Sequence, residues 1–92
     1  MDIRRFRARV AFGGKTRPVL AGFRPTLVLE GRKVLSNVEV IQPVSVQPDQ
    51  PATAVFAIAW DWPETCPLQE GTGFDVLEGD QMVGNGTVLA LI

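Results

Sequence analysis

Residues 5–12 have the sequence Arg-Phe-Arg-Ala-Arg-Val-Ala-Phe, in which apolar positions alternate with mostly basic ones. A period of two is typical of a β-strand that has one buried and one solvated face. The apolar face consists of Phe6, Ala8, Val10 and Phe12, whereas the solvated face carries the row Arg5, Arg7 and Arg9. The segment therefore predicts a strand with a strongly basic outer side.

Five further strand-like segments follow this one. We expect them at residues 19–29 (interrupted near Gly22 and Pro25), 34–40, 55–62, 74–77 and 82–92. In the segment 34–40 the alternation places Val34, Ser36, Val38 and Val40 on one face. In the segment 55–62 it places Phe56, Ile58, Trp60 and Trp62 on one face. Seven prolines and nine glycines leave few windows in which a helix could propagate. The pattern indicates an all-β chain, either a small sandwich or a closed barrel.

Residues 84–86, Gly-Asn-Gly, have two interpretations. An Asn-Gly pair is typical of a two-residue hairpin turn. Glycines inside a strand also mark a bulge or a bend at a barrel corner.

Composition predicts one globular domain over residues 1–92 and excludes most catalytic chemistry. The chain is 46% hydrophobic and contains no histidine, no tyrosine and a single cysteine, Cys66. Cys66 has no partner for a disulfide or metal site and no histidine to activate it, so we expect no metal, no cofactor and no enzyme activity. The start of the chain lacks the apolar core of a signal peptide, and the longest apolar run is only the seven residues 54–60. We therefore expect a cytoplasmic protein without a membrane partner.

Charge is unevenly distributed along the chain. Residues 1–33 contain all nine basic side chains and two acids, whereas residues 34–92 contain eight acids and no base. Such asymmetry can mark a nucleic-acid surface. We favour the alternative, in which strands from the two halves interleave and their charges pair across neighbours.

Four short motifs occur along the chain in a characteristic order. They are GGKTRP (13–18), GFRP (22–25), FDVLEG (74–79) and VGNGTV (83–88). They resemble the Gly-Gly-Arg loop, the Gly-Tyr-Arg-Pro segment, the Phe-x-hydrophobic-Arg-Glu-Gly strand and the Val-Gly-Ala-Gly-Val-Val closing strand of the third, C-terminal domain of bacterial elongation factor Tu. The alternation at residues 6–10 fits that domain's first strand, so the similarity spans nearly the whole chain.

The resemblance implies a closed six-stranded antiparallel barrel of Greek-key type, with residues 84–86 in its closing strand. The Gly-x-x-x-x-Gly-Lys-Ser/Thr phosphate loop is absent from the sequence. We therefore expect a third domain standing alone, without GTPase activity or a nucleotide cofactor.

The resemblance also implies which positions would face tRNA. Carried over by position, these are Lys15, Thr26, Glu78 and Gly79. Leu77 replaces the arginine that precedes Glu-Gly in the family, and Asp80 adds a second carboxylate that would repel a phosphodiester. The full set of candidate RNA-binding residues also includes the arginines of the first strand and of the segment after it. It comprises Arg5, Arg7, Arg9, Lys15, Arg17, Arg24, Thr26, Glu78 and Gly79.

Trp60 and Trp62 are the candidates for protein interaction. Either Trp62 is partly exposed near the strand end, as tryptophans at binding hot spots are, or both indoles cap the core. We expect a non-catalytic module that engages a protein partner, with translation-related proteins among the candidates. The alternative is an RNA- or tRNA-binding protein that uses the basic N-terminal strand and loop.

Overall fold

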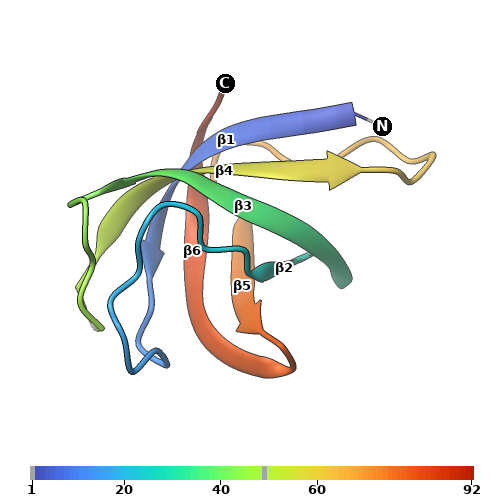
Figure 1. The fold of residues 1–92 in the computed structure, drawn as a ribbon. Coiled ribbons are helices and arrows are strands. Elements are labelled where there is room, and N and C mark those ends of the chain that lie inside the picture. The colour runs from blue at the N-terminus through green and yellow to red at the C-terminus, as the bar shows by residue number, and fades with distance from the viewer. Residues whose placement is uncertain (1, 49) are drawn as a thin grey trace.

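The computed structural model describes residues 2–48 and 50–92, which form six antiparallel strands that close into a barrel (Figure 1). The strands are β1 (Asp2–Ala11), β2 (Thr26–Leu29), β3 (Arg32–Gln42), β4 (Ala52–Trp60), β5 (Gly73–Glu78) and β6 (Gln81–Leu91). Around the barrel they follow the order β1-β4-β3-β2-β5-β6, and β6 pairs with β1. Because β2, β3 and β4 pair in chain order and β4, the last of them, lies beside β1, the topology is a Greek key. The predicted fold class is confirmed.

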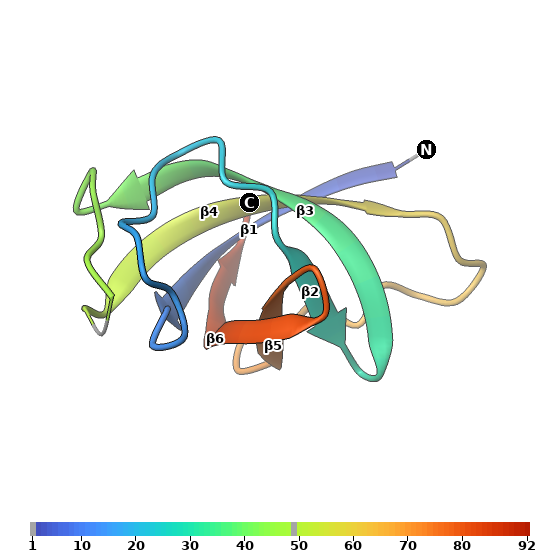
Figure 2. The same cartoon turned by 60° about the horizontal axis from the view of Figure 1, so that its bottom comes forward.

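The core is built from the inward side chains of all six strands. Phe6, Phe56 and Phe74 form its centre: the first two rings stack with centroids 5.5 Å apart, and Phe74 meets both edge-on. The alternation predicted for the first strand is confirmed, because its apolar side chains are buried and its arginines are exposed. In Figure 2, β3 and β4 arch over β5 and β6 around this core. The described residues form no apolar helix of membrane-spanning length.

Residues 84–86 lie inside β6, at the seam where it closes the barrel against β1. A Cβ on Gly84 would lie 2.3 Å from the carbonyl oxygen of Ala11, and one on Gly86 would lie 2.8 Å from that of Arg9. Any side chain here would push the two strands apart. The closing-strand interpretation is confirmed, and the hairpin-turn alternative is wrong.

The predicted inner face of β3 is wrong at one position. The register between β3 and β4 shifts between Val38 and Val40, where Glu39 is the extra residue. A bulge inserts one residue and so reverses the alternation beyond it. As a result Val40 points outward and Ile41 is buried in its place.

One predicted strand is shorter in the structure, and another begins and ends earlier in the chain. From the segment 19–29 only Thr26–Leu29 forms a strand, since residues 20–25 instead lead toward β3, where the N–H of Val38 donates to the carbonyl of Phe23 at 2.8 Å. The β4 strand ends at Trp60, so Trp62 lies beyond it rather than in its alternating pattern. Pro63, directly after Trp62, cannot donate a ladder hydrogen bond, which agrees with this early end.

Candidate functional site

Ion pairs join the basic first third of the chain to the acidic remainder. Within the described residues, Arg5 Nε lies 2.9 Å from Glu39 Oε1, and Lys15 Nζ lies 3.1 Å from Glu78 Oε2. Arg32 pairs with Glu64, and Lys33 Nζ lies 3.9 Å from Asp80 Oδ1. These pairs support the interpretation that the two halves neutralise each other across the barrel.

The structure brings together the four positions that the resemblance implied for tRNA. Lys15 Nζ donates to both carboxylate oxygens of Glu78, Thr26 is in register with Leu77, and Gly79 forms the turn that follows. However, the Lys15 side chain is only 12% exposed, and its ammonium also lies 4.7 Å from the centre of the Phe23 ring. Because this cation is neutralised and covered within the chain, it has little charge to offer a phosphate.

The other basic candidates are divided between two places. Arg5, Arg7 and Arg9 are exposed along β1, and Arg5 is the member that pairs with Glu39. Arg17 and Arg24 are exposed in the segment that joins β1 to β2. The basic candidates therefore lie on two parts of the chain, with Arg17 and Arg24 in the same segment as Lys15.

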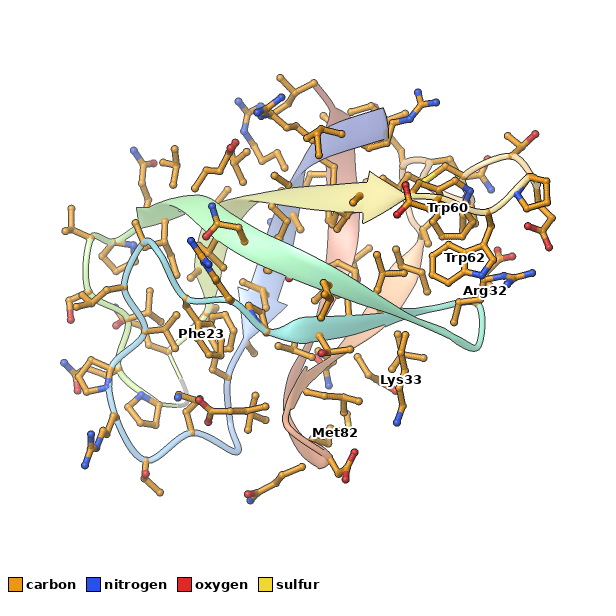
Figure 3. All side chains as sticks on the ribbon, turned by 45° about the vertical axis from the view of Figure 1, so that its right-hand side comes forward. Phe23, Arg32, Lys33, Trp60, Trp62 and Met82 are labelled. Atoms are coloured by element: carbon orange, nitrogen blue, oxygen red, sulfur yellow. The ribbon has the colours of Figure 1, made fainter. Side chains whose placement is uncertain are left out.

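The two tryptophans meet at one end of the barrel (Figure 3). Trp60 is buried, and its indole Nε1 donates to the carbonyl oxygen of Glu64 at 2.8 Å. Trp62 is partly exposed, and its ring lies 4.7 Å from that of Trp60 at an angle of 51°. The guanidinium of Arg32 lies 5.1 Å from the centre of the Trp62 ring. Trp60 is thus a core residue, whereas Trp62 is a fixed and accessible aromatic.

A groove of about 580 Å³ runs beside Trp62. We call it the Trp62 groove; it lies between the start of β1, the end of β6 and the segment after β4, and its lining includes Ile3, Arg4, Trp62, Cys66, Leu68 and Leu91. Its apolar and indole surfaces can bind another molecule, but the chain has no histidine beside the half-buried Cys66 thiol. Across residues 2–48 and 50–92 there is also no group of three potential metal ligands.

Three residues of these sites were not found by sequence reasoning. Arg32 and Glu64 hold Trp62 in place, and Phe23 covers Lys15. Each belongs to a loop or strand end whose neighbours become apparent only once the barrel closes. The composition gave one usable signal, the excess of acids after residue 33, which implied partners for the early bases.

Comparison with known proteins tests the resemblance of the motifs. No family model matches the chain. Elongation factor Tu 2 of Streptomyces avermitilis is 34% identical over 90 residues, which cover 92% of this chain. This chain resembles elongation factor Tu. It spans about a fifth (22%) of the length of that relative, and its six-stranded barrel agrees with the elongation factor Tu third domain that the motifs predicted.

Proposed function

We propose that residues 1–92 form a single non-catalytic binding domain that engages a protein partner of the translation machinery through the Trp62 groove. The relation to translation is supported by the similarity to elongation factor Tu 2. The choice of a protein partner is supported by the groove, whose lining combines the Trp62 indole and apolar side chains with charged ones such as Arg5 and Glu64.

The observation that carries this proposal is the way Trp62 is held. Its ring is fixed between Trp60 and the guanidinium of Arg32, and Arg32 is in turn fixed by Glu64. An aromatic side chain that is ordered before binding loses little conformational entropy when a partner covers it. Tryptophan and arginine are also enriched among the residues that dominate interface energies.

The proposal includes no catalytic step. Among the described residues, no side chain pairs a nucleophile with a base, and the sequence lacks a phosphate loop. We therefore expect no GTP hydrolysis above background from the purified chain, measured as phosphate release.

Affinity capture from bacterial extract tests the proposal directly. The wild-type chain should retain translation factors or ribosomal proteins identified by mass spectrometry, and Trp62→Ala should lose most of them. Met82→Ala is the matched control, because Met82 is half exposed in the β5–β6 hairpin and does not line the groove. Near-ultraviolet circular dichroism of each variant verifies that the barrel is intact. Capture of the same proteins by Trp62→Ala would contradict the proposed site.

A second candidate function is RNA binding, favoured by two exposed cations on β1. Arg7 and Arg9 form no ion pair with any described residue. An RNA-binding chain should bind total cellular RNA and aminoacyl-tRNA tightly at low salt and lose affinity steeply as salt rises. Arg7→Glu should then weaken binding strongly. Lys15→Glu should weaken it only if the loop at residues 13–18 also contacts the RNA. Absence of binding at every salt concentration would exclude this candidate.

A further inference from the structure

The outer side of β4 forms the floor of a second surface. Its outward residues are small and only partly exposed: Thr53, Val55, Ala57 and Ala59. Longer side chains of β1 and β3 rise on either side, with Arg5 and Asn37 both in register with Ala57. We call this surface, from β1 across β4 to β3, the β4 face.

One end of the β4 face is strongly apolar. Leu35 is 77% exposed and Ile3 is 48% exposed, and together with Ala57 and Ala59 they line a shallow pocket of about 350 Å³. Val40, turned outward by the β3 bulge, is 50% exposed on the same side. Single exposed apolar side chains are ordinary on protein surfaces, whereas a contiguous group of them marks an interaction site.

Asn37, which lines the same pocket, carries an unsatisfied polar atom. The side-chain oxygen of Asn37 is buried and accepts no hydrogen bond within the described part of the chain. Leaving a buried acceptor without a donor is unfavourable, and most such atoms in proteins have a partner. Because this oxygen is covered, an N–H group of a binding partner reaches it only after the Asn37 side chain turns toward the pocket.

The rim of the β4 face is positively charged. Arg7 and Arg9 stand along its β1 side, and Arg24 lines the pocket beside Leu35. None of these three forms an ion pair with a described residue. The carboxylate of Glu39 on this face is already paired with Arg5. A complementary partner therefore needs to supply carboxylates.

We propose that the β4 face docks an acidic segment of a partner protein, which inserts an apolar side chain between Ile3 and Leu35 and presents carboxylates to Arg7, Arg9 and Arg24. RNA fits this surface less well. The pocket has no aromatic ring on which a base could stack. The β4 face shares Ile3 and Arg5 with the Trp62 groove, so the two surfaces can be tested separately with variants that leave both residues unchanged.

Selection from a library of random peptides displayed on phage provides the probe. Peptides retained by the wild-type chain should be enriched in Asp and Glu next to Leu, Ile or Phe. A synthetic copy of the selected peptide is then titrated into each variant. Leu35→Glu, and the double change Arg7→Glu with Arg9→Glu, should each weaken its affinity by about tenfold or more. Val44→Glu is the matched control, because Val44 is 80% exposed in the loop after β3, and it should change the affinity by less than about twofold.

Three outcomes would overturn the proposal. The first is selection of neutral or basic peptides. The second is equal loss of affinity in Leu35→Glu and Val44→Glu, which would show no role for the apolar pocket. The third is tighter binding of poly(U) RNA than of the peptide, abolished by the double arginine change. Trp62→Ala should leave peptide affinity unchanged, so failure of the Trp62 groove and failure of the β4 face give different results.

Discussion

The β1–β4–β3 side of the barrel and the β2–β5–β6 side differ in whether their basic side chains are paired with carboxylates. At the β2–β5–β6 side, the β5–β6 turn region supplies carboxylates to Lys15 from the β1–β2 segment and to Lys33 at the start of β3. At the β1–β4–β3 side, Arg7 and Arg9 remain exposed without a carboxylate among the described residues, beside an apolar surface. The comparison shows that only some of the basic side chains form ion pairs within the folded chain. The remaining cations are available to another molecule.

The largest effect is expected where the two sides join, at the seam between β1 and β6. Gly84→Ala places a Cβ 2.3 Å from the carbonyl oxygen of Ala11, which is backbone and cannot rotate away. The change should lower the free energy of unfolding by about 3 kcal/mol, measured by urea denaturation. In Gly73→Ala the new Cβ meets nothing closer than 3.9 Å, so this control should cost far less. Equal losses in both would show that the seam is not tightly packed.

A smaller effect is expected from the buried hydrogen bond that ties β3 to the segment entering β2. Ser36 Oγ donates to the carbonyl oxygen of Pro25 at 2.6 Å, and both residues are buried. Ser36→Ala removes this donor but leaves the backbone N–H of Ser36 on the same oxygen. The free energy of unfolding should fall by about 1 kcal/mol. Thr87→Ala, at an exposed position of β6, is the control and should change little.

The ion pairs of the β2–β5–β6 side should contribute unequally. Lys15→Met should lower stability by about 0.5–1 kcal/mol at low salt, because the ammonium is mostly covered between Glu78 and Phe23. Lys33→Met should have no measurable effect, since Lys33 and Asp80 are both well exposed and 3.9 Å apart. Thermal unfolding at low and high salt checks both values. Identical behaviour of the two variants would mean that burial does not distinguish the pairs.

The smallest effect on stability is expected on the β4 face itself. Leu35 is 77% exposed, so Leu35→Glu should change the free energy of unfolding by less than about 0.5 kcal/mol in urea denaturation. Unchanged stability together with lost peptide binding would show that Leu35 contributes to binding and not to folding. Strong destabilisation would instead indicate that Leu35 packs within the chain.

Sequence patterns predicted much of the fold because the alternation of apolar and polar residues recurs in several strands. In β1 the alternation of Phe6, Ala8 and Val10 with arginines fixed both the strand and its buried face. The resemblance supplied barrel closure, which periodicity alone left open between a sandwich and a barrel. It also identified residues 84–86 as a strand, where local turn propensity favours a hairpin.

Other features depend on contacts that no local pattern contains. The outward turn of Val40 follows from a bulge set by pairing with β4, not by the residues around Glu39. Likewise, Lys15 meets Glu78 because the loop after β1 lies against the β5–β6 hairpin, where Gly14 N–H donates to the Val83 carbonyl at 3.0 Å. The Trp62 groove joins the chain's first strand to its last. Each is a consequence of long-range closure.

The pairing of β1 with β6 also determines when this barrel can be completed during synthesis. Phe6 lies opposite Leu91, so nearly the whole chain separates the two sides of the seam. Contacts between such distant residues form late, since a long loop must be ordered before they contribute. A nascent chain can assemble β1 to β5, but the edges of β1 and β5 stay open until β6 has left the ribosome tunnel. During that interval the unpaired edges are exposed to aggregation or to chaperones.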